Sequence, residues 1–342
     1  METRHKTVTR KCLITGVGGF IGQKLCQRLK ADGRYVYGVS LRSATPCCDK
    51  NYSIDITKPL VPRIFDGIDT VFHLAGKVHA LSEIKQDNED YFRINTDGTR
   101  HVLEAARAAG VTRFIYFSTV KAMSRDERLS QQAQDSSGEL RPWTEADTIE
   151  PDTPYGRSKL EAEKLVLNGC FVPEPVVLRL CMVYGVGAKG NLTKMLRAIN
   201  CGRFPPLPDF KNHRSMVHVQ DVLDAALLAA QRPEAVGQVF IVSDGVGYST
   251  RQMFELMCHA LDRPVPSWIV PLWVLRSLGW TGDAIGRIRG RRFFFDSDAF
   301  ALLAGSACFS SNQIETMLGF RPKWNLERAL PEMVEELRRI KG

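Results

Sequence analysis

The stretch Lys11-Cys-Leu-Ile-Thr-Gly16-Val-Gly-Gly19-Phe-Ile-Gly22 decides the fold of this chain. Its apolar start predicts a strand at 11–15, and apolar residues at fourfold spacing after Gly22 predict a helix that ends near residue 31. The glycines lie between strand and helix, where they allow a tight turn, close approach of backbone N–H groups to a pyrophosphate, and close helix packing. The stretch therefore predicts the first unit of a dinucleotide-binding sheet.

Strands and helices continue to alternate through the first 245 residues. We expect strands at 35–39, 53–56, 70–75, 114–118, 176–180 and 238–243, and helices at 88–109, 154–167 and 219–231. This alternation predicts an α/β fold, a Rossmann-type doubly wound parallel sheet that binds ligands at the carboxyl ends of its strands. From residue 248 onward, short helices and loops predict a smaller, mainly helical substrate domain. The expected domains are 9–180 plus 215–245 and 181–214 plus 246–342.

Composition and charge fit an ordinary globular protein and argue against a nucleic-acid partner. The 342 residues are 44% hydrophobic, with 46 Lys and Arg against 38 Asp and Glu. The formal net charge of +8 is spread along the chain, and no basic stripe is interleaved with regular aromatics. A small anionic substrate suits this mild positive bias.

The nine cysteines indicate free thiols in a reducing compartment, because none forms a C-x-x-C pair. Adjacent Cys47 and Cys48 are expected to be exposed loop thiols, with a redox pair as the alternative. The N-terminal residues lack the apolar stretch of a signal peptide. We therefore expect a cytoplasmic protein without an integral membrane segment.

Segment 268–280 is the longest apolar stretch, but it contains Pro271 and Arg276 and is too short to span a bilayer. We expect a helix there that covers the substrate site or packs in the core. The alternative is an amphipathic element that lies on a membrane surface.

A second motif, Tyr155-Gly-Arg-Ser-Lys159, begins a predicted helix, so Tyr155 and Lys159 lie one turn apart on the same face. A lysine ammonium beside a phenol stabilises the phenolate and lowers the phenol pKa, which suits the tyrosine to general acid or base catalysis. Phe117-Ser118-Thr119 ends the fifth predicted strand and supplies a hydroxyl at the same sheet edge.

The end of the second strand bears on the choice of cofactor. An acidic residue is expected there when the adenosine ribose is unphosphorylated, but this chain has Val39-Ser-Leu-Arg-Ser43. The charge of Arg42 suits a 2′-phosphate, so NADP is favoured over NAD. Asp55 ends the third predicted strand, where it could meet the adenine or cap a turn.

These motifs together resemble the extended short-chain dehydrogenase/reductase family, of the NAD-dependent epimerase/dehydratase type. The resemblance covers most of the chain. Its further landmarks are His73-Leu-Ala75-Gly76, Asn95-Thr-Asp-Gly98-Thr99, Leu178-Arg179-xxx-Val183-Tyr184-Gly185 and Arg214-Ser-Met-Val-His218-Val-x-Asp221-Val222.

The resemblance implies a set of site residues and partners. The catalytic residues would be Tyr155, Lys159 and Thr119, with Ser118 as a neighbouring hydroxyl. The cofactor-binding residues would be Gly16, Gly19, Phe20, Ile21, Gly22, Arg42, Asp55, Ile56, Leu74, Ala75, Gly76, Asn95, Tyr155 and Lys159. The substrate-binding residues would be Asn191, Arg214, Arg291 and Arg292, and no metal is expected. The resemblance also suggests a UDP-sugar substrate and a homodimer.

The residues after Thr119 limit which of the family's activities are expected. The family's sugar 4,6-dehydratases carry an Asp-Glu pair there, whereas this chain has Val120 and Lys121, so elimination is not expected. The favoured activity is reduction of a UDP-4-keto-6-deoxy-N-acetylhexosamine at C4. The alternative is a 4-epimerase of the UDP-glucose or UDP-GlcNAc type with tightly bound NAD. A more distant alternative is a dinucleotide-binding sensor or assembly subunit without turnover.

Overall fold

The computed structural model describes residues 10–41, 47–78, 88–123, 141–147, 150–289 and 295–341. The chain divides into two compact units. Unit 1 comprises Met1–Ala122, Pro154–Arg179 and Leu223–Phe240, and unit 2 comprises Met123–Thr153, Leu180–Val222 and Ile241–Gly342. The stretch 125–148, which is rich in Ser, Gln, Asp and Glu and which the sequence predicts to be a surface loop, lies mostly outside the described residues.

Within the described residues, a seven-stranded sheet has the order β3-β2-β1-β4-β5-β6-β9. Its strands are β1 (Lys11–Thr15), β2 (Tyr35–Ser40), β3 (Lys50–Ser53), β4 (Thr70–His73), β5 (Arg113–Thr119), β6 (Glu174–Leu180) and β9 (Val239–Val242). The pairs β1–β2, β1–β4, β2–β3 and β4–β5 are parallel. This order places β1 beside the point where the winding reverses, which confirms the predicted doubly wound fold.

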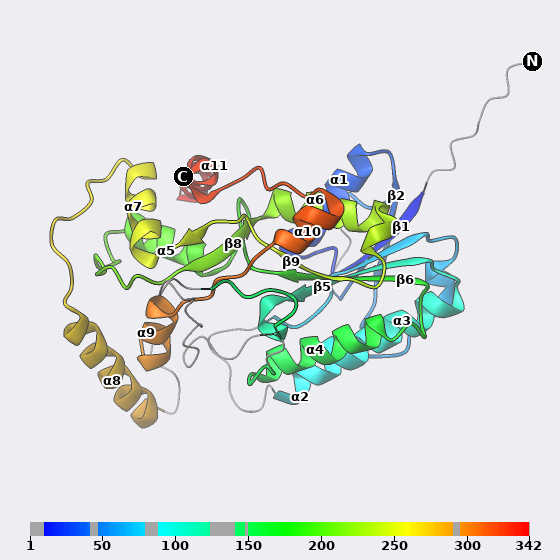
Figure 1. Cartoon of the computed structure of the whole chain (residues 1–342), viewed down its shortest axis with the longest axis horizontal. Coiled ribbons are helices and arrows are strands. Elements are labelled where there is room, and N and C mark those ends of the chain that lie inside the picture. Colours follow the sequence, from blue (N-terminus) through cyan, green and yellow to red (C-terminus); the bar gives the residue numbers. More distant parts are fainter. Residues whose placement is uncertain are drawn as a thin grey trace, which may run out of the picture. The chain divides into compact units, whose positions relative to one another are not determined.

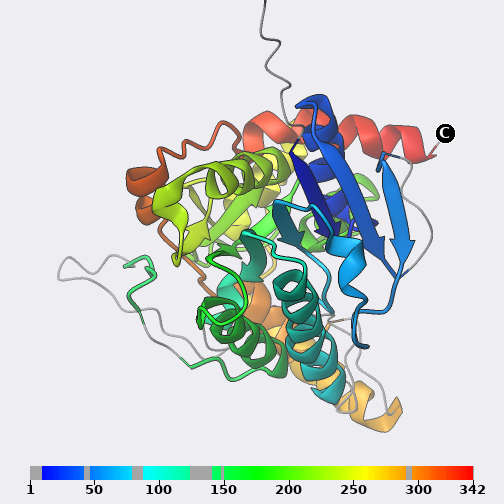
Figure 2. The ribbon, with the colours of Figure 1, turned by 90° about the vertical axis from the view of Figure 1, so that its right-hand side faces the viewer.

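Helices cover both faces of this sheet. They are α1 (Phe20–Ala31), α2 (Asn88–Tyr91), a π-helical turn (Phe92–Asp97), α3 (Gly98–Ala108), α4 (Pro154–Leu167) and α6 (Val219–Gln231). Figures 1 and 2 show α3 and α4 on one face of the sheet and α1 and α6 on the opposite face. Because both faces are covered, β4 is buried along its whole length and β5 along all but its last residue, without the alternation of a half-exposed strand.

The third strand differs from the sequence expectation. It spans Lys50–Ser53, whereas the sequence pattern placed it at 53–56. The strand ends because the Asp55 carboxylate accepts hydrogen bonds from the backbone N–H and the hydroxyl of Thr57, at 3.0 and 2.8 Å, which turns the chain. Isoleucine side chains after Ser53 imitate a strand, but the aspartate turn overrides them.

Unit 2 combines a small sheet with helices. In its described part, β7 (Met182–Tyr184), β8 (Arg214–His218) and β10 (Gly247–Tyr248) have the order β10-β8-β7. The helices are α5 (Asn191–Asn200), α7 (Thr250–Ala260), α8 (Leu272–Arg289), α9 (Ser297–Ala304), α10 (Asn312–Leu318) and α11 (Leu326–Lys341). The prediction of short helices here is wrong for α8 and α11, which have 18 and 16 residues.

The core of unit 2 is formed by α5, α7 and α11 on the small sheet, with buried residues such as Leu196, Met257 and Leu330. The landmark Asp221 serves this packing. Its carboxylate accepts the backbone N–H groups of Lys323 and Trp324, at 2.9 and 3.1 Å. Asp221 therefore ties the start of α6 to the segment that leads into α11.

No helix in the described part of the chain is long and apolar enough to cross a membrane.

Candidate active site

The glycine turn forms a cradle that side chains would fill. Gly16 has φ of +72°, and a Cβ there would lie 2.7 Å from the backbone nitrogen of Ala75 at the end of β4. A Cβ at Gly22 would collide with the carbonyl oxygen of Gly16. Gly19 precedes the first residue of α1 and cannot cap that helix with a side chain, so the amides of Phe20 and Ile21 begin an uncapped helix. This geometry fits the pyrophosphate of a dinucleotide.

Asn95 joins the end of β4 to α4. Its Oδ1 accepts the N–H of Lys77 at 2.8 Å, and its Nδ2 donates to the Lys77 carbonyl at 3.1 Å and to the Ser158 hydroxyl at 3.0 Å. Ser158 in turn donates to the carbonyl oxygen of Tyr155 at 2.8 Å. Gly76 is necessary here, because a Cβ there would lie 2.8 Å from Asn95 Oδ1. Asn95 thus positions the turn of α4 that carries the predicted catalytic tyrosine, and it lies in the π-helical turn.

Lys159 is buried below Tyr155, one turn further along α4. Its ammonium donates to the carbonyl oxygen of Phe117 at 2.7 Å and lies 4.1 Å from the centre of the Tyr116 ring. Burial lowers the pKa of Lys159 to about 7, while the Glu163 carboxylate acts in the opposite direction. A lysine in this state responds strongly to a negative charge that forms beside it.

Tyr155 is half-buried, and its ring centre lies 5.6 Å from that of Tyr91. The structure therefore places Tyr155 and Lys159 on one helix above the end of β5, as the sequence spacing predicts.

The two hydroxyls at the end of β5 have different surroundings. Successive residues of a strand point to opposite faces, so Ser118 and Thr119 diverge. Ser118 is buried and donates to Oε1 of Glu163. Thr119 is half-exposed, and its Oγ1 accepts the N–H of Lys121 at 3.3 Å. Thr119 is the hydroxyl that remains accessible at the sheet edge.

A buried ion pair that sequence reasoning missed lies behind the catalytic helix. Arg179 on β6 contacts Glu163 on α4 through both Nε and Nη2, with Nη2 to Oε2 at 2.7 Å. The side chain of Glu163 is 2% exposed and that of Arg179 is 11% exposed. The signal in the sequence is a glutamate four residues after Lys159 on the apolar face of α4. This pair fixes α4, and with it Tyr155 and Lys159, on the sheet.

His73 is a second buried residue whose role the sequence did not reveal. The Thr15 hydroxyl lies 2.6 Å from its Nδ1, and the Thr99 hydroxyl lies 2.9 Å from its Nε2. Thr99 donates its own proton to the Asn95 carbonyl, so Nε2 carries the proton and donates to Thr99. Burial, and next the charge of Lys159, lower the pKa of His73 to about 3. His73 is therefore a neutral connection between β1, β4 and α3.

Replacing Lys159 with methionine is expected to raise stability more at pH 6 than at pH 9. The folded lysine loses its proton above about pH 7, whereas an unfolded lysine keeps its proton to about pH 10.4. Between these values the unfolded chain binds more protons, so the wild-type protein gains stability as the pH rises. The increase in unfolding free energy of Lys159→Met over wild type should therefore shrink toward pH 9. Urea unfolding of the cofactor-free protein measures it.

The matched control is Lys164→Met on the exposed side of the same helix. We expect a stability change that is small and nearly the same at both pH values. A gain from Lys159→Met that grows toward pH 9 would contradict the low pKa of this lysine.

Other predicted contacts lie further from this centre. The Asp55 carboxylate caps the turn at Thr57, and Ile56 is buried against Gly98. The backbone N–H of Leu74 donates to the Thr15 carbonyl at 3.1 Å, beside the glycine cradle. Arg42, Arg291 and Arg292 lie outside the described residues. Asn191 and Arg214 belong to unit 2, where Asn191 is the exposed first residue of α5 and Arg214 is the half-buried first residue of β8.

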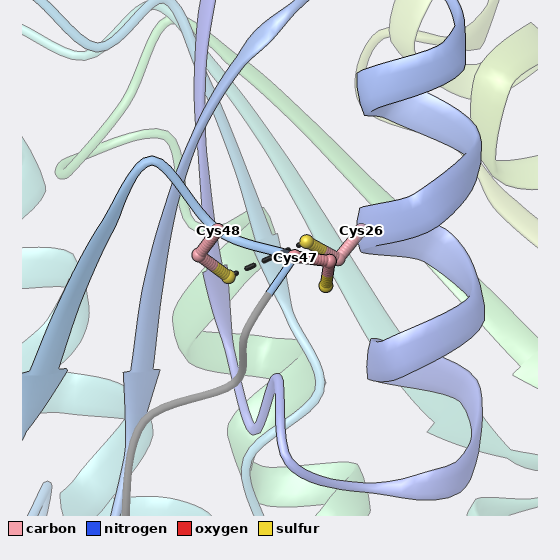
Figure 3. A group of neighbouring side chains, drawn as sticks. All are labelled: Cys26, Cys47 and Cys48. Carbon is pink, nitrogen blue, oxygen red and sulfur yellow. Dashed lines mark hydrogen bonds between the residues drawn. The ribbon is translucent and has the colours of Figure 1, made fainter.

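Three cysteines gather between α1 and the segment that leads into β3, as Figure 3 shows. The Sγ atoms of Cys26 on α1 and of Cys47 and Cys48 before β3 lie within 4.8 Å of one another. Cys47 and Cys48 are half-buried, so the prediction of exposed loop thiols is wrong. A Cβ at Gly38 would lie 2.7 Å from the Cys48 Sγ, so this glycine makes room for the group. Three convergent thiols have the chemistry to hold a soft metal ion.

The chain combines a glycine cradle at the end of β1 with a tyrosine and a buried lysine one turn apart on α4. Together these features define a nicotinamide-dependent enzyme of the short-chain dehydrogenase/reductase class. Residues 12–243 match the sequence model of the NAD dependent epimerase/dehydratase family. The chain belongs to this family. Its NAD dependence confirms the predicted nicotinamide cofactor, and the glycine cradle fits that group.

Curated relatives cover most of the chain. A UDP-glucose 4-epimerase of Vibrio cholerae is 27% identical over 347 residues, 98% of each chain. An N-acetyl-alpha-D-glucosaminyl-diphospho-ditrans,octacis-undecaprenol 4-epimerase of Escherichia coli O157:H7 is 22% identical over 94% of each chain. A 4-hydroxy-2-methyl-3-oxo-4-farnesyl-3,4-dihydroquinoline-1-oxide ketoreductase of Stigmatella aurantiaca is 25% identical over 81% of each chain.

Solved structures share the fold. MoeE5 in complex with UDP-glucose and NAD has a TM-score of 0.73 at 23% identity, over 97% of this chain and 100% of that one. UDP-glucose 4-epimerase of Thermotoga maritima with UDP-glucose has a TM-score of 0.74 at 23% identity, with the same coverage. At this identity the likeness concerns the fold alone.

Proposed function

We propose that this protein is a UDP-sugar 4-epimerase that holds NAD through the catalytic cycle. The observation that carries the proposal is that Tyr155 and Lys159 lie one turn apart on α4, with the Lys159 ammonium on the Phe117 carbonyl near the end of β5, the strand whose last residue is Thr119. Val120 and Lys121 follow Thr119, and neither suits the proton transfers of an elimination. The 4-epimerase from Vibrio cholerae, related over 98% of both chains, supports epimerisation over reduction.

In the proposed reaction Tyr155 moves a proton at the C4 hydroxyl of the sugar. As the hydroxyl loses its proton to the phenolate, the Thr119 hydroxyl donates a hydrogen bond to the C4 oxygen. The ammonium of Lys159 stabilises the phenolate between turnovers, and a phenolate beside it raises the lysine pKa from its resting value of about 7. NAD held by the glycine cradle would supply reversible hydride transfer at C4.

The remaining residues orient this centre. Asn95 holds Ser158 and, through it, the backbone of Tyr155, so the phenol reaches the substrate from one direction. After the keto sugar has turned, Tyr155 returns the proton to the C4 oxygen. The substrate diphosphate would be bound by Arg214 and Asn191, and Arg291 or Arg292 would add a positive charge.

The second candidate is reduction of a UDP-4-keto-6-deoxy-N-acetylhexosamine. The sequence favours this activity because Arg42 stands in place of the acid expected at the end of the second strand, which suits exchangeable NADPH. The Stigmatella ketoreductase also supports it. In this reaction Tyr155 donates its proton to the C4 oxygen once, and the sugar does not turn.

Release of cofactor distinguishes the two candidates. We expect denaturation of the purified protein to yield NAD close to one equivalent, and UDP-GlcNAc or UDP-glucose to be converted to its C4 epimer without added cofactor, as followed by NMR. Cofactor-free protein that instead oxidises NADPH with a UDP-4-keto-6-deoxy-GlcNAc substrate would establish the reductase. A homodimer remains a prediction that sedimentation velocity tests.

A further inference from the structure

The outward side of α8 and the segment before it carry large apolar side chains that no described residue covers. Trp268, Trp273 and Trp280 are 61, 70 and 69% exposed, and Ile288 is 86% exposed. Three of the five tryptophans of the chain therefore lie open within 13 residues. We define the tryptophan face as Trp268, Ile269, Trp273, Trp280 and Ile288, all of which are exposed. A single exposed leucine is common on protein surfaces, but a cluster of large exposed apolar side chains like this one marks an interaction surface.

Packing of α8 leaves this face outward. Leu275, Gly279 and Gly282 form the buried side of the helix. A Cβ at Gly282 would collide with the Phe295 carbonyl oxygen, and a Cβ at Gly279 would lie 3.3 Å from Ser297 Cα. The helix thus approaches the start of α9 closely through its glycines, which holds its orientation. Packing in the core, one of the two placements expected for this segment, is wrong for its tryptophans; a helix that covers the substrate site stays a prediction.

The spacing of the two tryptophans on α8 makes a continuous stripe. Trp273 and Trp280 are seven residues apart, which is close to two helical turns, so they lie on one side of the helix. Ser277 and Ala284, which share this side, are exposed and small. The stripe therefore presents its two indole rings with small side chains between them, opposite the glycine side.

The charges beside the stripe are positive. Arg276 and Arg287 flank the stripe, three residues after Trp273 and seven after Trp280, and Arg289 is exposed at the last position of α8. The acidic residue of the helix, Asp283, accepts the N–H of Ser297 at 3.2 Å and so faces the packed side. Tryptophan prefers the boundary between apolar and aqueous layers, and arginines there contact lipid phosphates. The face is complementary to an anionic bilayer surface.

We propose that the tryptophan face docks this protein on membranes that contain anionic phospholipid. Helix α8 lies along the surface, with its indoles among the headgroups and its arginines against phosphates. The membrane is not crossed in this arrangement. This binding function goes beyond the proposed sugar chemistry and does not depend on it. A second copy of the chain is the competing occupant of the same face.

Vesicle sedimentation tests the proposal with the full chain. We expect the protein to pellet with vesicles of phosphatidylcholine and one third phosphatidylglycerol, and far less with phosphatidylcholine alone or at high salt. Trp273→Ser combined with Trp280→Ser should weaken binding about tenfold or more. Arg276→Gln, Arg287→Gln and Arg289→Gln together should weaken vesicle binding about 100-fold, because each arginine near an anionic surface strengthens binding about fivefold.

Matched controls distinguish docking through the tryptophan face from nonspecific adsorption to vesicles. Val61→Ser removes an exposed apolar side chain of unit 1, and Arg321→Gln with Arg338→Gln and Arg339→Gln removes three exposed charges elsewhere in unit 2. Both should pellet like wild type, and all variants should keep the wild-type circular dichroism. Wild-type protein that stays in the supernatant, or tryptophan variants that bind equally well, would overturn the proposal. So would a dimer that the tryptophan variants dissociate while vesicle binding persists.

Discussion

Replacing Tyr155 with phenylalanine is expected to lower turnover by about 10²–10⁴-fold, the usual contribution of a positioned acid or base. The ring and its contact with Tyr91 are retained, so the loss isolates the hydroxyl proton. Binding of the cofactor should change little, because the glycine cradle lies on β1 and α1 and does not involve the phenol. Turnover of a UDP-sugar and the NAD content of the purified protein measure the two effects.

Tyr91→Phe is the matched control. It makes the same chemical change 5.6 Å away, at a buried hydroxyl without a hydrogen-bond partner among the described residues. Turnover should stay near the wild-type value. If Tyr155→Phe turned over as fast as Tyr91→Phe, the proton transfer assigned to Tyr155 would be refuted. Any catalytic role of Lys159 would then not depend on the Tyr155 phenol.

Replacing Glu163 with alanine is expected to lower the free energy of unfolding by about 3–5 kcal/mol. The reason is that Arg179 would stay buried without its carboxylate, and the Ser118 hydroxyl would also lose its acceptor. Urea unfolding of the cofactor-free protein at pH 7 measures the change. Glu163→Gln keeps the shape and one acceptor oxygen, so we expect it to fall between wild type and Glu163→Ala.

Glu161→Ala provides the control for this stability effect. Glu161 lies two residues earlier on the same helix and is exposed, so its loss should change the unfolding free energy by less than about 0.5 kcal/mol. Equal effects of the two alanine variants would mean that the buried ion pair does not hold α4 on the sheet.

The dinucleotide-binding unit could be read from the sequence because its signals are local. β1 spans Lys11–Thr15 as expected, and α4 and α6 begin and end at the expected residues, 154–167 and 219–231. Apolar spacing, a proline at the first turn of α4 and glycine stops act within one or two helical turns. The third strand was misplaced because the turn at Asp55 competes with two isoleucines, and apolar pattern alone does not show which wins.

The candidate site was recognisable for the same reason, but only in part. Tyr155 and Lys159 share one helical turn, so spacing was sufficient to place them together. The choice between Ser118 and Thr119 was not readable, since it depends on which face of β5 meets Glu163 from another element. The half-burial of Cys47 and Cys48 likewise depends on Cys26, more than 20 residues earlier in the chain.

By itself, the sequence determined the class of this protein: a doubly wound sheet, a glycine turn for a dinucleotide and a tyrosine–lysine pair, each encoded by neighbours along the chain. Only the tertiary structure decided the protonation of His73, the pairing of Glu163 with Arg179 and the exposure of the tryptophan face. These properties depend on burial, and burial is set by residues that are distant in the chain and meet only when the elements pack.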